Sequence, residues 1–226
     1  MYQISIVKLK KALFILFRSL SDLSFYWPFF EGVISDLING KNLITIRAIT
    51  HVRDRFNNTR SAIGLSSNYL KIPLENFFQG DFTIMLWYRK FSTTNFQRII
   101  ECGSREDDSI LMSASYSDVQ TTFFKIYDTM NDLNDTAKSV IGKTPIVLNI
   151  WYHLTFVLQG SNGYIYVNGI LDGQGDLNFP KNIFRSSCHL GGSLKANILA
   201  TAIFDDLKIF NRALSINEII NEYEIN

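Results

Sequence analysis

The stretch 151–172, WYHLTFVLQGSNGYIYVNGILD, constrains the fold more than any other part of the chain. Residues of Trp151–Leu158 alternate between two faces, which is the two-residue period of a β-strand. Residues 159–163 then reverse the chain, and Asn168-Gly169 reverses it a second time. Asn-Gly favours a type I′ turn because both of its residues readily adopt positive φ. We therefore predict three short antiparallel strands joined by two tight turns.

Strand patterns of similar length recur along the chain, and turn residues separate them. The segment 81–89, DFTIMLWYR, is apolar at nearly every position and predicts a central strand covered on both faces. Helix signals are confined to the C-terminus, where Ser215 and Glu218 form a capping box. The pattern predicts an all-β fold, an antiparallel two-sheet β-sandwich or jelly roll with one short C-terminal helix. The other predicted strands are 24–29 (at a sheet edge because of Pro28), 43–49, 61–65, 69–72, 98–102, 110–114, 122–127, 187–190 and 202–210, and the predicted loops include 129–138 and 173–176.

Length and composition set the domain organisation. The chain has 226 residues, of which 46% are hydrophobic, enough for one large β domain. No Pro/Gly/Ser-rich linker follows residue 24, so we predict a single domain over 24–226 and a leader or poorly ordered segment over 1–23. The 22 basic and 21 acidic residues leave a net charge of +1. Such a balance provides no field for nucleic acid, and we expect no nucleic-acid partner.

The N-terminal segment bears on localisation. A basic stretch, Lys8–Lys11, precedes the apolar run 12–17, which is the order found in a signal peptide. The run is shorter than a normal signal core and far shorter than a membrane span. The alternatives are a weak or truncated secretion signal and an amphipathic or poorly ordered leader. We expect an extracellular or secreted protein that this chain alone does not attach to a membrane.

The cysteines and two glycosylation sequons also depend on the compartment. Cys102 and Cys188 are too few for a zinc site. They form either one disulfide, as in an extracellular protein, or two buried thiols. Asn57 and Asn134 each begin an Asn-x-Thr sequon and would be glycosylated only in a secreted protein.

Five motifs in order carry a resemblance to a known family. They include FTIMLW at 82–87, WYHLTFV at 151–157, IYVNG at 165–169 and IFDDLKIFNRALS at 203–215. This order resembles the laminin G-like, concanavalin A-like jelly rolls, which are related to pentraxins, and the resemblance extends over nearly the whole chain from about residue 25. It implies the fold. It leaves the function open, because the fold hosts lectins, adhesion modules and glycoside hydrolases.

The resemblance also implies a calcium site, since relatives often hold calcium near the closing strand. The matching ligand here is Asp205, and Asp36 is a plausible partner distant in the chain. The alternative is that Asp205 hydrogen-bonds a turn. A second, rim-bound ion or ligand would use loop carboxylates, which are otherwise solvated. The rim candidates are Asp107, Asp108, Asp172 and Asp176.

The sequence carries little sign of catalysis. Glycoside hydrolysis on this fold needs two carboxylates on the same face of a strand, whereas the acids at 106–108 and 205–206 are adjacent and face opposite ways. No Gly-x-Ser-x-Gly elbow is present, and His153 alternates with core positions, which favours a structural role. Aromatic platforms for sugars could come from tyrosines, although strand aromatics are more often core. These tyrosines are Tyr116, Tyr127, Tyr164 and Tyr166.

We therefore expect a non-catalytic recognition module that binds carbohydrate or an extracellular protein partner, with possible assistance from Ca²⁺. The alternatives are a glycoside hydrolase of the same fold with carboxylates off the usual pattern, and a structural domain of a larger extracellular protein.

Overall fold

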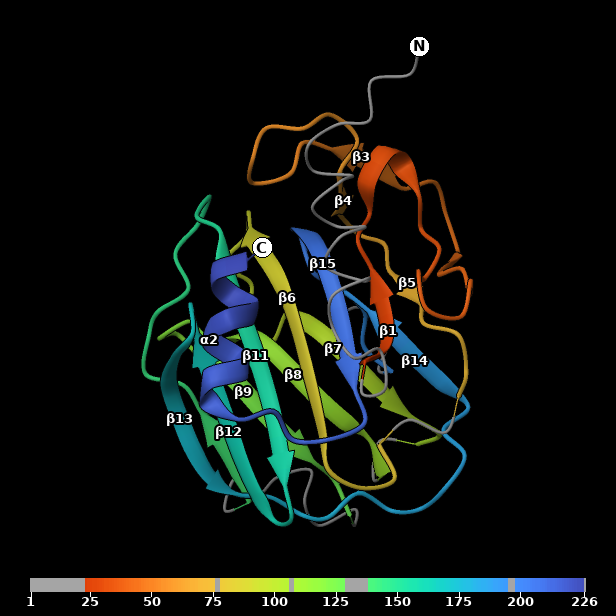
Figure 1. Cartoon of the computed structure of the whole chain (residues 1–226). Helices are drawn as coiled ribbons and strands as arrows, with labels where there is room; N and C mark the ends of the chain where they lie inside the picture. Colours follow the sequence, from red (N-terminus) through yellow and green to blue (C-terminus); the bar gives the residue numbers. More distant parts are fainter. Residues whose placement is uncertain (1–22, 76–77, 106–107, 129–137, 195–197, 226) are drawn as a thin grey trace.

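Two antiparallel sheets stack face to face, with one helix on the outer face of the first (Figure 1). The predicted all-β sandwich with a single C-terminal helix is thereby confirmed. The structure is a computed structural model, and it describes residues 23–75, 78–105, 108–128, 138–194 and 198–225. The predicted leader at 1–23, apart from Leu23, and most of the predicted loop at 129–138 lie outside these residues.

The sheet nearer the viewer in Figure 1, the front sheet, has the order β13-β12-β11-β6-β15-β4-β3, and β1 also pairs with β15. β15 pairs with β4 through its first residues and with β1 through its last, so β1 and β4 lie along the same side of β15. Among the described strands β1 pairs with β15 alone, which agrees with the edge position predicted from Pro28. The bounds are β1 Leu23–Trp27, β3 Thr50–Val52, β4 Ala62–Leu65, β6 Phe82–Lys90, β11 Tyr152–Gln159, β12 Asn162–Val167, β13 Ile170–Asp176 and β15 Ala202–Phe210.

The second sheet, the back sheet, has the order β10-β9-β8-β7-β14-β5-β2. Its bounds are β2 Ile44–Thr45, β5 Leu70–Lys71, β7 Arg98–Gly103, β8 Ile110–Tyr116, β9 Thr121–Ile126, β10 Ser139–Ile141 and β14 Ser187–Leu190. A short 3-10 helix, Phe30–Gly32, follows β1, and helix α2 spans Ile216–Ile225.

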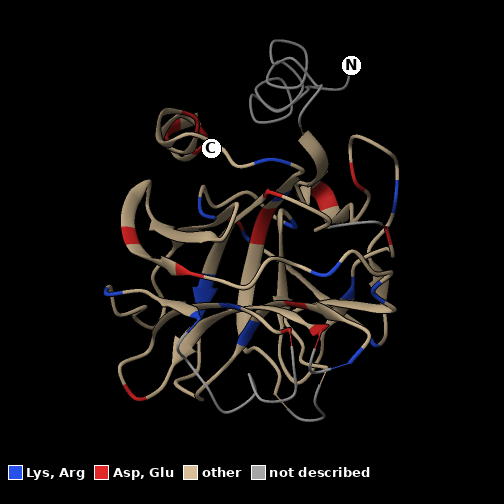
Figure 2. Cartoon of the chain, turned by 90° about the horizontal axis from the view of Figure 1, so that it is seen from below, with Lys and Arg blue, Asp and Glu red and all other residues tan. Residues whose placement is uncertain are grey.

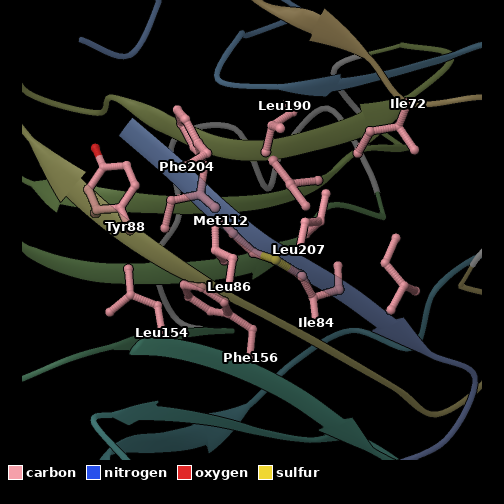
Figure 3. Close-up of a cluster of buried hydrophobic side chains, with 14 of the residues drawn as sticks. Ile72, Ile84, Leu86, Tyr88, Met112, Leu154, Phe156, Leu190, Phe204 and Leu207 are labelled. Carbon is pink, nitrogen blue, oxygen red and sulfur yellow. The ribbon is translucent and has the colours of Figure 1, made fainter. Parts of the chain in front are cut away.

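The core lies between the sheets and is formed by alternate residues of the facing strands (Figure 3). Each fully buried aliphatic or aromatic side chain stabilises the fold by about 1.5–3 kcal/mol relative to exposure. The residues of this core that Figure 3 labels are Ile72, Ile84, Leu86, Tyr88, Met112, Leu154, Phe156, Leu190, Phe204 and Leu207.

Strand β6 is central, as its apolar sequence predicts. It pairs with β11 on one side and with β15 on the other, and Arg89 is its only residue that is not buried.

Helix α2 packs on the outer face of the front sheet, where its Ile219 shares a buried cluster with Met85 of β6. The predicted capping box begins the helix, because the Ser215 amide donates to Glu218 at 2.8 Å and the Glu218 amide donates to Ser215 Oγ at 3.4 Å.

The two predicted reversals of the 151–172 stretch are also present. Gln159 pairs with Asn162, so β11 and β12 are joined by a two-residue turn. Asn168 and Gly169 have φ of 53° and 76° and join β12 to β13, as a type I′ turn requires.

The prediction of a flexible loop at 173–176 was wrong, because these residues belong to β13 and pair with β12. Gly173 and Gly175 allow β13 to come close to β10 of the other sheet. A Cβ on Gly173 would lie only 2.7 Å from the carbonyl oxygen of Ile141 in β10. Glycine in a strand can therefore mark a site where another backbone comes near. The predicted strand 43–49 shortens to Ile44–Thr45, whose side chains are exposed and have no core to face.

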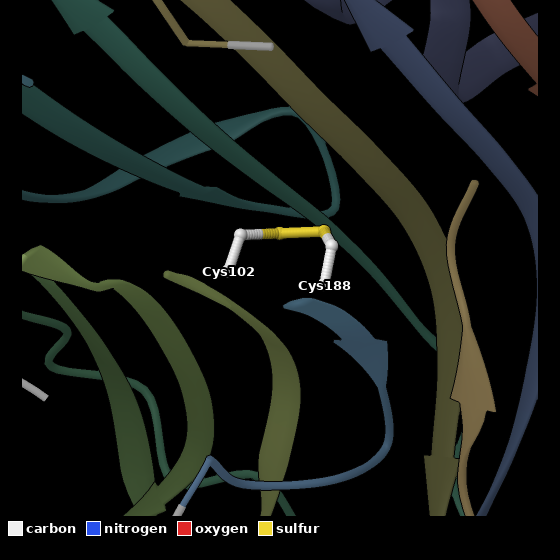
Figure 4. The surroundings of a disulfide bond; sticks show 2 residues. All are labelled: Cys102 and Cys188. Carbon is white, nitrogen blue, oxygen red and sulfur yellow. A yellow bond between two sulfur atoms is a disulfide. The ribbon is translucent and has the colours of Figure 1, made fainter. Parts of the chain in front are cut away.

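A disulfide joins Cys102 in β7 to Cys188 in β14 (Figure 4). The two residues are register partners on neighbouring strands and are 1% and 2% exposed. Of the two alternatives left open by the sequence, the structure has the disulfide rather than two thiols.

Candidate ligand-binding groove

A groove of about 320 Å³ lies on the outer face of the front sheet, near the ends of β3, β4, β6 and β15. Figure 1 shows β3, β4 and the first residues of β15 to the right of α2, which lies in front of β11. Thr50, Gly64 and Ile203 form part of the lining, and they are neighbours across three adjacent strands. The groove is therefore part of the sheet surface and not of a loop alone.

The floor is low because Gly64 has no side chain. Its flanking register partners, Thr50 and Ile203, both carry side chains and form walls on either side. Val52 also lines the groove, and a Cβ on Gly64 would lie only 3.3 Å from its Cγ1. Little space therefore separates Gly64 from the Val52 side chain.

Phe91 provides an aromatic side chain on the groove lining. It directly follows β6, its amide donates to the carbonyl of Thr201 at 2.9 Å, and its side chain is 42% exposed. The hydroxyl-bearing residues Thr50, Ser66 and Thr201 also line the groove. An exposed ring beside hydroxyls suits a ligand with both an apolar face and polar groups.

Asn68 shapes one wall of the groove. Its Nδ2 donates to the carbonyl of Ala48 at 3.1 Å, and its Oδ1 accepts from the Tyr69 amide at 2.8 Å. Because the side-chain amide is engaged at both ends, Asn68 holds the 48–50 segment against the 66–69 turn.

Arg89 stands beside the groove on the same outer face. It is the register partner of Ile203, and its Cζ lies 5.2 Å from the ring centroid of Phe91. The arginine and the phenylalanine are thus in cation–π contact.

Arg55 occupies the next part of the outer face. Its Nη1 lies 2.6 Å from Asp205 Oδ2 and its Nη2 lies 2.9 Å from Asp206 Oδ2. Its Cζ is 4.5 Å from the Trp87 ring and 4.4 Å from the Phe56 ring. A bulge in β15 puts Asp206 at φ 48°, and both carboxylates then reach the same guanidinium.

The two residues predicted to hold calcium have other partners within the chain. Asp205 Oδ2 accepts from Arg55, and Asp205 Oδ1 accepts from the Asp206 amide at 2.8 Å. Asp36 accepts from the amides of Tyr26 and Asn39, both at 2.6 Å. Among the described residues, no group of three or more His, Cys, Asp or Glu could hold a metal ion. A calcium ion at Asp205 would have to displace a guanidinium, so these contacts fit an ion pair better than a metal.

The rim candidates are not brought together in the groove. Asp108 Oδ1 accepts from the amides of Ser104 and Arg105, and Asp172 accepts from the amides of Lys143 and Thr144. Asp176 is exposed at the end of β13, and Asp107 lies outside the described residues. The buried carboxylates of Asp108 and Asp172 therefore hold loops in place.

Of the two predicted glycosylation sequons, Asn57 is exposed and Asn134 lies outside the described residues.

His153 lies under α2 and not in the groove. Its ring centroid is 5.2 Å from that of Trp87 and 5.9 Å from that of Tyr223. Burial, together with the nearby positive charges of Lys208 and Arg55, lowers the pKa of His153 to about 3. The imidazole is therefore neutral at pH 7, consistent with the structural role predicted for it.

The tyrosines considered from sequence do not line the groove, and Phe91 was missed. Tyr116 stacks on Phe123 with ring centroids 4.7 Å apart, and Tyr166 is buried. Phe91 comes directly after a strand in which every residue except Arg89 is buried, so its sequence context resembles core. Its position just past the end of the strand was the only signal available.

Charge is mixed over the molecule. In the end-on view, Lys and Arg are interspersed with Asp and Glu (Figure 2). In the part of the chain that the structure covers, no helix has both the length and the apolar character to cross a membrane.

Several solved structures share this fold at low sequence identity. Domain 4 of AbnA, an extracellular arabinanase from Geobacillus stearothermophilus solved with arabinotriose, is 17% identical with a TM-score of 0.73, covering 88% of this chain and 97% of that one. The binding domain of botulinum neurotoxin serotype G is 18% identical with a TM-score of 0.62, over 89% of this chain and 50% of that one. Trypanosoma rangeli sialidase is 14% identical with a TM-score of 0.66, over 90% of this chain and 32% of that one.

No curated protein matches the sequence. A family model described as the concanavalin A-like lectin/glucanases superfamily matches residues 64–220, which is most of the chain and includes the central strands of both sheets. The protein therefore belongs to the concanavalin A-like lectin/glucanases superfamily.

Proposed function

We propose that the protein is a non-catalytic recognition module that binds a saccharide in the groove beside Phe91. The observation that carries the proposal is the exposed Phe91 ring on a groove that also has three hydroxyl-bearing residues. Sugar rings have an apolar face that packs on an aromatic ring and hydroxyls that hydrogen-bond to polar groups beside it.

The groove supports binding rather than hydrolysis. None of its lining residues is Asp or Glu. Glycoside hydrolysis in most families needs two carboxyl groups about 5–9.5 Å apart across the scissile bond. The alternative of a hydrolase would therefore need a different site from this one.

The comparisons add support at the level of the fold. The arabinanase domain with TM-score 0.73 was solved with arabinotriose, so a related sandwich accommodates a short saccharide. This likeness concerns the fold alone, because the identity is 17%.

We also infer that the protein works outside the reducing cytosol. The disulfide between Cys102 and Cys188 supports an oxidising compartment. The exposed Asn57 sequon would be accessible to glycosylation there.

The test is binding of the full chain to a glycan array, followed by titration calorimetry with any saccharide bound. We expect Phe91→Ala to weaken binding about tenfold or more, because an anchoring aromatic is lost. Phe184→Ala is the matched control, since Phe184 is 59% exposed and does not line the groove. Equal affinities of wild type and Phe91→Ala would refute the assignment of the groove, and a wild type that binds no glycan would refute the proposed function.

A further inference from the structure

The charge beside the groove bears on the kind of saccharide it would take. Arg89 lies at the groove edge for two independent reasons. Its register partner, Ile203, lines the groove, and its guanidinium contacts the ring of Phe91, which also lines it. A ligand packed on Phe91 would therefore come within reach of the Arg89 guanidinium.

Arg89 has no acidic partner among the described residues. Arg55, Arg98 and Arg212 each form a salt bridge with a carboxylate, and Arg89 forms none. Its Nε is buried and has no hydrogen-bond acceptor, although the residue as a whole is partly exposed. A guanidinium without an acidic partner is favourably paired by an anionic acceptor that a ligand supplies.

A second arginine stands at the other side of the groove. Arg47 directly precedes the lining residue Ala48, and its Nη1 has a weak contact with the Ser67 carbonyl at 3.5 Å. It too forms no salt bridge with a described carboxylate, and it is exposed. Two guanidinium groups without acidic partners thus flank a groove whose lining has no carboxylate.

The two carboxylates of β15, the strand that also carries the lining residue Ile203, are already engaged. Asp205 and Asp206 both form salt bridges with Arg55, and Asp206 Oδ1 also accepts a hydrogen bond from the Tyr26 hydroxyl at 2.6 Å. Both are buried, at 0% and 2% exposure, so neither is available to pair with Arg89 at the surface.

We propose, on the basis of the proposed function, that the saccharide is anionic and that its carboxylate or sulfate pairs with Arg89. The planar guanidinium donates two parallel hydrogen bonds to such a group. A neutral sugar can use Phe91 and the hydroxyls of the groove, and its own oxygens can accept from Arg89, but it brings no negative charge to pair with the guanidinium.

The test compares charged and neutral saccharides of matched length on the full chain. Oligogalacturonate, its methyl ester and a sulfated galacto-oligosaccharide are titrated against wild type, Arg89→Gln, Arg89→Lys and Arg105→Gln. Arg105 is the control because it is exposed on the β7–β8 loop of the other sheet. Thermal melts of each variant report whether it is folded.

We expect the uronate or the sulfate to bind at least about tenfold more tightly than the neutral ester, with the tighter of the two identifying the anion. Arg89→Gln removes this preference, Arg89→Lys retains part of it, and Arg105→Gln changes nothing. The preference also falls with added salt, because screening weakens exposed charge pairs.

Equal binding of the neutral ester and the acid, or an acid preference that survives in Arg89→Gln, would overturn the inference while the proposed function stands. A wild-type protein that binds neither these probes nor any arrayed glycan would overturn both.

Discussion

Lys208 and Glu222 form a buried ion pair between strand β15 and helix α2. The Nζ–Oε2 distance is 2.8 Å, and the side chains are 1% and 0% exposed. Lys208 Nζ also lies 4.9 Å from the centroid of the Tyr26 ring. Removing one partner would leave the other charged and buried, which is costly, so this pair and Ile219 together hold α2 on the sheet.

We therefore expect Glu222→Ala to lower the free energy of unfolding by about 3–5 kcal/mol. Glu224→Ala is the matched control, because Glu224 is exposed on the same helix, and we expect a change within about 0.5 kcal/mol. Urea denaturation followed by tryptophan fluorescence measures both. Equal stabilities of the two variants would contradict the role given to the ion pair.

Acidification should destabilise the protein through His153. Its pKa is about 3 in the folded chain and near 6.5 when unfolded. Between these values the unfolded state binds the proton and the folded state does not, so stability falls as the pH falls below about 6.5, by about 1.4 kcal/mol per pH unit.

A series of urea denaturations from pH 7 to pH 5 measures this slope. The pKa values of His51 and His189 are also lowered by burial and contribute in the same direction. His153→Gln isolates the contribution of His153, and we expect a shallower slope. The pKa of Glu218 is lowered to about 2, chiefly by its hydrogen bond with Arg212, so its contribution is lost only at more acidic pH. An unchanged slope in His153→Gln would show that His153 does not titrate as the structure implies.

Loss of the disulfide should destabilise the fold without abolishing the sandwich. Cys102 and Cys188 are 86 residues apart, and opening so long a loop increases the entropy of the unfolded chain. We expect Cys102→Ala with Cys188→Ala to cost about 2–4 kcal/mol. The measurement is denaturation of this double variant beside the oxidised wild type. Free thiols detected in unreduced wild-type protein would contradict the pairing itself.

Filling the groove should block ligand binding while the fold persists. Gly64→Val puts a branched side chain on the groove floor, where its Cβ meets Val52 Cγ1 at 3.3 Å. Valine suits a strand, so we expect a stability change below about 1.5 kcal/mol together with loss of saccharide binding. Gly80→Val is the control, because nothing lies within 4 Å of a Cβ at Gly80. Retained binding in Gly64→Val would place the ligand elsewhere.

Calcium should not stabilise the protein through Asp205, because Arg55 already supplies positive charge between Asp205 and Asp206. We expect the same melting temperature in EDTA and in excess CaCl₂. MgCl₂ at equal ionic strength controls for screening. A rise in melting temperature that is specific to calcium would support the calcium site expected from the family resemblance.

Much of the fold could be predicted from local patterns. Alternation in 151–158, the Asn168-Gly169 turn and the capping box of Ser215 and Glu218 depend only on short-range backbone geometry, and all three are present in the structure. The prediction of a loop at 173–176 was wrong because glycine occurs both in flexible loops and in strands where another backbone comes close. Only the position of β10 beside Gly173 shows that the second case applies here.

The candidate site could not be predicted from the sequence, because it is formed by strands that pair in the sheet but lie far apart in the chain. Phe91, Gly64, Thr50 and Ile203 belong to four segments, and they meet only because β3, β4, β15 and β6 are neighbours in the front sheet. The role of Asp205 was decided in the same way, since its partner Arg55 is 150 residues away. The sequence by itself determined most of the strands and turns, because backbone preferences are local. Only the tertiary structure decided which side chains remain exposed and which charges are paired, because both depend on contacts between residues far apart in the chain.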